Sequence, residues 1–406
     1  MTSTLFADVR VFDGTGRDPF PAQVLVEGDR ITAVADRVAA DLRTGARVID
    51  GAGRTLLPGL VDAHAHLGFG STVEHLSRRR DEPDEERALL VAHAGRVLLD
   101  HGITSAYSGG NRLPRTETAA RKAFAEGWLP GPRLKAASWE GSAGMVEPGV
   151  YDFPGVDGRA SDPGSVARFV TDMAELGVDI VKLSLSGESA VVRGTSRIVQ
   201  FTDEEVAAAA HAAEKHGVWL TAHAHAAESV KTAVRHGVRA VYHCTFADEE
   251  ALDLLGAARD RLFVAPTPGI VHANLHEAGG EPEPGMEVEA TRDAVRAVVP
   301  ELVARGVRVV PGGDYGFAWN PVGRNLRDLE LFVDWFGFTP AQALRAATEY
   351  GGQVMGMGDE LGLIREGFLA DLVLVDGDPL DDVRILQDPR RLTVIMKDGR
   401  LHKAAG

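Results

Sequence analysis

The chain has 406 residues, a length that suits one large domain with an accessory domain, or two domains. It carries 43 Lys and Arg against 59 Asp and Glu, and this net charge of -16 argues against nucleic acid or an anionic membrane as a partner. No run of about 18 uncharged apolar residues, the minimum for a membrane span, is present. The single cysteine, Cys244, excludes an intrachain disulfide, and with no secretion signal at the start we expect a cytoplasmic protein.

The two ends of the chain share a short-strand pattern that the middle lacks. Residues 22–28 and 30–36 are predicted strands on either side of a Gly-Asp turn. Residues 371–377 and 392–403 are predicted strands near the other end, the second with an Asp-Gly hairpin signal. We therefore predict a small β-domain built from both termini, residues 1–57 and 361–406, with residues 58–360 inserted between them.

The middle of the chain alternates between helix and strand patterns. Four helix patterns each end at a glycine and lead into an apolar strand: 164–177, 201–217, 227–237 and 294–306. Thr202 and Glu205 have the spacing of a capping box at the start of the second helix. Such an alternation predicts a parallel α/β sheet, either an open doubly wound sheet or a (β/α)8 TIM barrel. We favour the barrel because no G-x-G-x-x-G phosphate loop follows a first strand.

Histidines stand at the ends of two of these strands. His64 and His66 end the strand of residues 58–66 and share one face, since alternate side chains of a strand point the same way. His223 and His225 share a face in the same manner. A His-x-His pair alone is a weak metal signal, so these pairs need partners from other strands.

Three further polar residues lie on later strands. Lys182 shares a face with Ile180, and alternation places His243 with Val241, with Cys244 pointing the other way. Asp314 follows two glycines at the end of its strand. All of these residues are near the carboxyl ends of strands, where barrel enzymes build their active sites.

Lys182 makes a metal site the strongest interpretation of this set. A lysine on a buried strand loses solvation, so it should be neutral, ion-paired or chemically changed. A carbamate formed with CO2 would turn it into an anion able to bridge two metal ions. Imidazole nitrogens and carboxylate oxygens together suit Zn2+ or a similar divalent ion.

Six motifs make the chain resemble the amidohydrolase superfamily: PGLVDAHAH (58–66), IVKLSLSG (180–187), TAHAH (221–225), VYHCTF (241–246), GGDYG (312–316) and REGFLADLVLVDGDPL (365–380). The branch that is most similar is imidazolonepropionase-like and includes metal-dependent dipeptidases that cleave Xaa-Pro or Xaa-Arg bonds. The resemblance implies a (β/α)8 barrel with a small β-sandwich. It also implies a hydrolase acting on an amide-type C–N bond in a dipeptide, an N-acyl amino acid, or a cyclic or xenobiotic amide or carbamate.

The resemblance also implies the ligands of two divalent ions. His64, His66 and Asp314 would hold the first ion, carboxylated Lys182 would bridge, and His223 and His243 would hold the second. The metal would be Zn2+, with Mn2+, Co2+ or Fe2+ as alternatives, and CO2 would be needed to modify Lys182. A hydroxide between the ions would attack the carbonyl carbon while Asp314 passes its proton to the leaving nitrogen. His243 would hold the ion that polarises the carbonyl.

The role of His225 stays open at this point, between contacting the substrate, supporting the ligands and packing. Three polar loops, residues 138–163, 187–200 and 266–290, are expected to cover the barrel mouth. Candidate substrate residues besides His225 are Arg193 and Arg197, as a clamp for a carboxylate, and His272, with Tyr151 and Trp139 as an aromatic wall.

Two alternatives remain. The same metal site would serve a lactonase, an ester hydrolase or a phosphotriester hydrolase, and a non-catalytic binding protein would have kept the fold without the chemistry. In every case we expect a small-molecule ligand, no nucleic acid or membrane partner, and a homo-oligomer.

Overall fold

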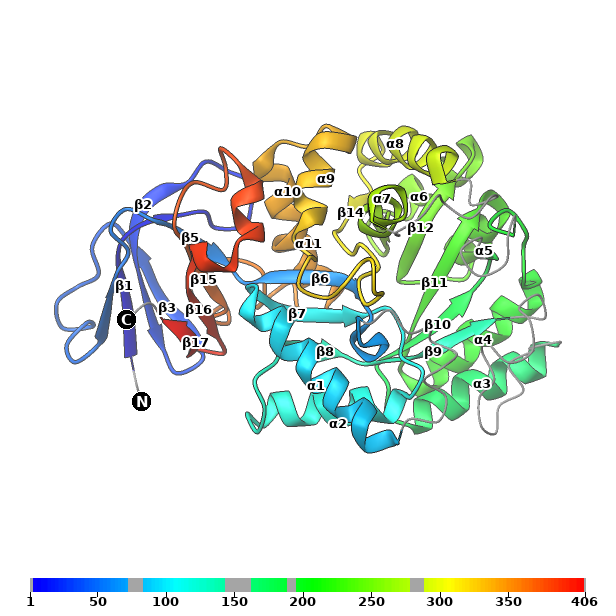
Figure 1. Ribbon diagram of the computed structural model, residues 1–406, viewed down its shortest axis with the longest axis horizontal. Coiled ribbons are helices and arrows are strands. Elements are labelled where there is room, and N and C mark those ends of the chain that lie inside the picture. Colours follow the sequence, from blue (N-terminus) through cyan, green and yellow to red (C-terminus); the bar gives the residue numbers. More distant parts are fainter. Residues whose placement is uncertain (1–2, 72–82, 143–161, 188–194, 278–287, 405–406) are drawn as a thin grey trace.

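The computed structural model describes residues 3–71, 83–142, 162–187, 195–277 and 288–404. Figure 1 shows two parts joined side by side, a β-sheet domain that holds both chain ends and a larger α/β part. The second part carries every candidate metal ligand.

Strands from both ends of the chain form the smaller part. Its eight strands follow the order β17-β16-β15-β5-β1-β2-β3, with β4 paired to β1. Antiparallel pairing of β15 with β5 joins the two chain ends in one sheet. The strands are β1 Ser3–Val11, β2 Phe20–Glu27, β3 Arg30–Ala35, β4 Arg47–Asp50, β5 Thr55–Pro58, β15 Leu372–Val375, β16 Leu392–Lys397 and β17 Arg400–Ala404.

Parallel strands form the centre of the larger part. One sheet has the order β14-β13-β12-β11-β10-β9 and another the order β6-β7-β8. The strands are β6 Leu60–Ala65, β7 Ile103–Ser108, β8 Arg133–Lys135, β9 Ala137–Ser142, β10 Ile180–Ser184, β11 Trp219–Ala226, β12 Ala240–Phe246, β13 Phe263–Ala265 and β14 Arg308–Val309.

Two connections join these sheets into a ring. Only Ala136 separates β8 from β9, so they are successive parts of one run of chain. At the other side Ala63 N donates to Pro311 O and His66 N donates to Tyr315 O, both at 2.9 Å. These bonds link the first strand to the segment after the last one. A closed barrel requires such a link, and an open sheet lacks it.

Helices surround the parallel strands (Figure 1). They are α1 Asp84–Asp100, α2 Pro114–Ala125, α3 Pro163–Glu175, α4 Asp203–His216, α5 Ala227–Arg235, α6 Glu249–Ala257, α7 Pro268–His276, α8 Val288–Ala304, α9 Arg327–Phe336, α10 Pro340–Ala347 and α11 Glu349–Val354, with short 3-10 turns at Leu67–Phe69, Val383–Gln387 and Pro389–Arg391. The predicted capping box of α4 is confirmed, because the Thr202 side chain accepts from Glu205 N and the Glu205 side chain from Thr202 N.

Two apolar clusters separate the faces of the parallel strands. Val181, Leu220 and Val241 belong to the cluster that also contains the buried faces of the helices. Ile180 and Tyr242 belong to a second cluster with residues such as Tyr107 and Phe263 of neighbouring strands, which fills the inside of the ring. Alternate residues of one strand therefore face the helices and the interior, as expected for a strand buried on both sides.

The predicted loops at the barrel mouth need correction. The segment 138–163 begins within strand β9, and the segment 266–290 contains helix α7. Glycine, serine and glutamate in the sequence ASWEGS (137–142) made this strand look like a loop, although pairing with β10 keeps it extended. Within the three segments, residues 143–161, 188–194 and 278–287 lie outside the described residues.

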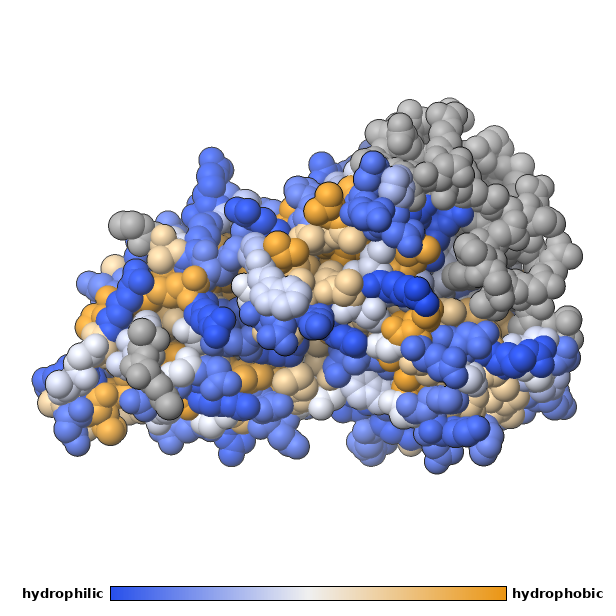
Figure 2. Space-filling model, turned by 90° about the horizontal axis from the view of Figure 1, so that it is seen from below, coloured by the Kyte–Doolittle hydropathy of each residue, from blue (hydrophilic) through white to orange (hydrophobic). Residues whose placement is uncertain are grey.

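Within the described ranges, no helix combines the length and apolar character that crossing a membrane requires. Figure 2 shows one face of the molecule, on which most side chains are hydrophilic and the apolar ones form small separate groups.

Candidate metal centre

His64, His66 and Asp314 form one group of potential ligands. Their nitrogen and oxygen atoms lie within 4.8 Å of one another. Asp314 Oδ1 is 2.9 Å from His66 Nε2 and 3.6 Å from His64 Nε2. The two histidines come from the end of β6 and the aspartate from the segment after β14, so the link that closes the ring also assembles this group.

Neighbouring groups fix the two imidazoles. His66 Nδ1 donates to the carbonyl oxygen of Gly110 at 2.8 Å, and the ring stacks on Phe69. The His64 ring stacks on Tyr242 with centroids 3.8 Å apart. A Cβ on Gly109 would lie 2.0 Å from a ring carbon of His64, so only glycine fits there. Hydrogen bonding to a ligand's second nitrogen is the usual way in which proteins orient histidines around a metal.

His223, His225 and His243 form a second group, again with ligand atoms within 4.8 Å. His223 Nε2 donates to the carbonyl oxygen of Gly187 at 3.2 Å. His225 Nδ1 hydrogen-bonds to Thr245 Oγ1 at 2.8 Å and stacks on His243. His225 is therefore itself a potential ligand, and it also packs against another potential ligand, His243.

The two ring nitrogens of His243 differ in their hydrogen bonding. Its Nδ1 hydrogen-bonds to Thr267 Oγ1 at 2.7 Å, while its Nε2 is buried and has no hydrogen-bond partner among the described residues. Buried polar nitrogens are seldom left without a partner. A metal ion would satisfy this atom.

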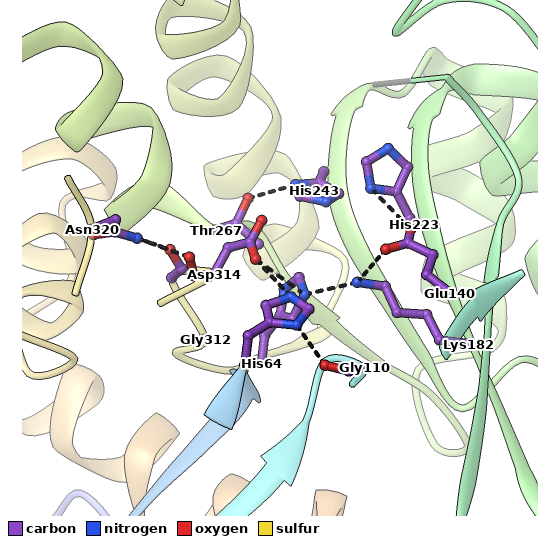
Figure 3. A network of polar contacts seen from close by, with 12 residues as sticks. His64, Gly110, Glu140, Lys182, His223, His243, Thr267, Gly312, Asp314 and Asn320 are labelled. Atoms are coloured by element: carbon purple, nitrogen blue, oxygen red, sulfur yellow. Dashed lines mark hydrogen bonds and ion pairs between the residues drawn. The ribbon is translucent and has the colours of Figure 1, made fainter. Parts of the chain in front are cut away.

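Lys182 lies between the two groups (Figure 3). Its Nζ is 3.0 Å from His64 Nε2 and 3.2 Å from Glu140 Oε2. The other oxygen of this carboxylate, Oε1, is 3.6 Å from His223 Nδ1. Sequence analysis missed Glu140 because it fell in a segment interpreted as a loop. The segment ASWEGS comes one strand before the strand of Lys182, and interpreting it as a strand would have identified Glu140.

Strict alternation along β12 was wrong for His243. Val241 and Cys244 both belong to the outer cluster against the helices, whereas the His243 ring contacts His64 and His223 in the interior. The reason is local backbone geometry, because φ is 70° at His243 and 56° at Cys244. Asp314 has φ 61°, also in the left-handed region. Such strained residues occur often at functional sites.

The charge states suit metal binding. Burial, the largest cause, holds the pKa of His64 and of His243 well below the ordinary value, so both rings are neutral at pH 7. Burial alone would raise the pKa of Asp314, but His64, His66 and Lys182 outweigh it and lower this pKa below its ordinary value. Neutral imidazoles beside a carboxylate are the forms that bind a cation.

The predicted substrate residues are only partly placed. The Arg197 guanidinium lies 3.6 Å from the centre of the Phe246 ring, and Phe246 is next to His225. His272 contacts Arg327, His276 and Trp335, none of which belongs to either ligand group. Trp139 is 4% exposed and buried in β9. Tyr151 and Arg193 lie outside the described residues.

The donor set fits a pair of divalent ions. It offers neutral imidazole nitrogens from two groups, a carboxylate in the first group and a lysine between them. Two of its buried nitrogens, His64 Nδ1 and His243 Nε2, have no hydrogen-bond partner among the described residues.

The chain is similar to several known proteins over most of its length. The chain is 25% identical to the ochratoxinase of Aspergillus niger over 380 residues, which is 86% of this chain and 76% of that protein. It is 26% identical over 414 residues to the imidazolonepropionase of Rubrobacter xylanophilus, covering 94% of this chain and 91% of the relative. A solved Xaa-Pro dipeptidase with methionine bound in its active site superimposes with a TM-score of 0.81 and 26% identity, over 99% of this chain and all of the other.

The sequence model of the amidohydrolase family matches residues 55–402, most of the chain. The chain therefore belongs to the amidohydrolase family and is a hydrolase of that family.

Proposed function

We propose that the protein is a hydrolase with two divalent metal ions on a (β/α)8 barrel, acting on the amide bond of a dipeptide or an N-acyl amino acid. The observation that carries this proposal is the convergence of two ligand groups, with His64 and His243 ring centroids 5.8 Å apart and Lys182 between them. His64, His66 and Asp314 would hold the first ion, and His223 and His243 the second, with Lys182 bridging as its carbamate. As an alternative, His225 would supply a third nitrogen ligand to the second ion.

When bound, the two ions would supply a water of lowered pKa and a polarised substrate carbonyl. Residues of the chain would transfer the proton and orient the metal ligands. Asp314, ionised and next to His66, would accept the proton of the attacking water and pass it to the leaving nitrogen. Thr267 and Gly110 fix the orientation of His243 and His66 through hydrogen bonds.

The position of Arg197 supports the proposal that the substrate carries a free carboxylate. Its guanidinium rests on Phe246, at the end of the strand that carries His243, so the charge lies near the second ligand group. The side chain is exposed in this structure and is therefore accessible to a substrate. Guanidinium groups bind carboxylates in a bidentate manner. The names of the similar proteins, an Xaa-Pro dipeptidase and an ochratoxinase, point to substrates with amide bonds.

A substrate screen tests this proposal. The apoprotein, reconstituted with Zn2+ or Mn2+, should hydrolyse dipeptides or N-acyl amino acids and lose this activity when the metal is removed. Each active substrate is then compared with its C-terminal amide. Arg197→Gln should raise KM for the free acid about tenfold or more and leave the amide nearly unchanged, because only the acid loses a charge-assisted bond. Activity on lactones, carbamates or phosphotriesters alone would contradict the proposed substrate class.

A further inference from the structure

We propose that Glu140 is a further ligand of the second metal ion, bound beside His223. The proposal rests on the proposed two-metal function. It adds a carboxylate from β9 to the histidines of β11 and β12.

Strand pairing brings Glu140 to the site. Glu140 lies directly opposite Lys182 in the pairing of β9 with β10, and Ser184 lies opposite His223 in the pairing of β10 with β11. A register shift between Ile180 and Lys182 sets this alignment. Three neighbouring strands thus present a carboxylate, an amine and an imidazole to one region, as Figure 3 shows.

The two oxygens of Glu140 face different partners. Oε2 is 3.2 Å from Lys182 Nζ, and Oε1 is 3.6 Å from His223 Nδ1. Two atoms bound to the same tetrahedral zinc at bond lengths of 2.0 to 2.1 Å lie about 3.3 Å apart. The separation of Glu140 from His223 is close to that value. His223 Nε2 donates to Gly187, and Nδ1 is the nitrogen that faces Glu140.

Charge balance also favours ligation. Two divalent ions bring four positive charges, of which Asp314 and a carboxylated Lys182 cancel two. Glu140 cancels another at a centre where most ligands are buried, and uncompensated buried charge is costly. Once Lys182 is carboxylated it also becomes an anion next to Glu140. A cation between the two carboxylates removes this repulsion.

The simpler role for Glu140 is that of a counter-ion to the Lys182 ammonium. The two roles predict opposite effects of Glu140→Gln on metal binding. A counter-ion favours the charged amine, so its loss would leave the affinity for the second ion unchanged or raise it by easing carboxylation. Loss of a ligand would lower that affinity.

Zn2+ titration of the apoprotein against a chromogenic chelator separates these outcomes. The unmodified protein should bind two ions, and Glu140→Gln should weaken the second on the order of 10- to 100-fold while the first keeps its affinity. Glu126→Gln, at an exposed glutamate that ends α2, is the matched control and should bind both ions normally. In a Lys182→Ala background, adding Glu140→Gln should abolish the binding of the second ion that remains.

A spectroscopic variant guards against indirect effects. Glu140→Cys loaded with Co2+ should gain a thiolate-to-metal absorption band, and the unmodified protein reports any contribution from the buried Cys244. Normal second-site affinity of Glu140→Gln, together with no new band, would overturn the ligand role. Fewer than two ions bound to the unmodified protein would instead overturn the two-metal proposal itself.

Discussion

Asp314 combines a left-handed backbone with contacts to both imidazoles of the first group. Its side chain is the only carboxylate in the two buried ligand groups of the described residues. In the proposed mechanism, the Asp314 carboxylate would therefore both help to bind the first metal ion and transfer a proton.

Asp314→Asn should separate these two tasks. The amide keeps an oxygen that can face the first ion but cannot accept a proton, so turnover should fall by about 100- to 10,000-fold while most metal is retained. Steady-state kinetics on the best substrate, with metal content measured on the same sample, checks this. Near-normal kcat with full metal occupancy would assign proton transfer to another group.

The sequence predicted the site residues that carry obvious chemistry. The histidines of both pairs lie in one region of the structure together with Lys182 and Asp314, because parallel strands present their carboxyl ends at one rim. Glu140 was missed, and its contacts come from strand pairing and a register shift rather than from any local motif. The inward turn of His243 was missed because it depends on backbone angles that composition does not reveal.

At the scale of elements, the helices with glycine ends were predicted more reliably than the short strands. Gly217 ends α4 with φ 67°, as its position after the helix pattern suggested. In contrast, β14 spans only Arg308–Val309, and β9 was interpreted as part of a loop. The extended conformation of such short strands comes from their neighbours, which a single segment does not show.

Hydrogen bonds of Glu117 connect three elements, namely α2, β7 and β9. Its buried carboxylate accepts from Ser108 Oγ at the end of β7 and from Ala137 N at the start of β9. Ser108 Oγ in turn accepts from Gly110 N, and the Gly110 carbonyl orients His66. Burial, the largest cause, raises the pKa of Glu117 from 4.5 to about 7.

This pKa predicts how stability depends on pH. Between about pH 4.5 and 7 the folded state holds a proton that the unfolded state has lost, so stability falls as pH rises, by at most about 3 kcal/mol. Glu117→Gln has no proton to lose, so its stability relative to the unmodified protein should improve from pH 5 to 8. Urea unfolding of both apoproteins at several pH values measures the difference.

Glu126→Gln, an exposed change at the end of the same helix, serves as the control and should follow the unmodified protein. An equal pH dependence in Glu117→Gln and the unmodified protein would show that Glu117 is ionised throughout this range.

At the scale of the whole molecule, strands from both chain ends complete one sheet, and this sheet packs on the larger α/β part. Arg133 of β8 lies at this junction, where it donates to Asp371 at 2.7 Å and also pairs with Asp398. Asp371 directly precedes β15, and Asp398 lies in the turn between β16 and β17. A single guanidinium thus connects the first part of the parallel ring to the C-terminal strands of the other sheet.

Removing this guanidinium should loosen the junction. The Asp371 side chain is only 2% exposed, so Arg133→Met would leave a buried carboxylate without a cation and cost about 3 to 5 kcal/mol of stability. Adding Asp371→Asn to that variant should restore part of the loss, because the remaining buried group is then neutral. Arg96→Met, at an exposed pair with Asp100, should cost less than about 1 kcal/mol. If urea unfolding found Arg133→Met as mild as Arg96→Met, the two parts of the molecule would have to be held together by apolar packing instead.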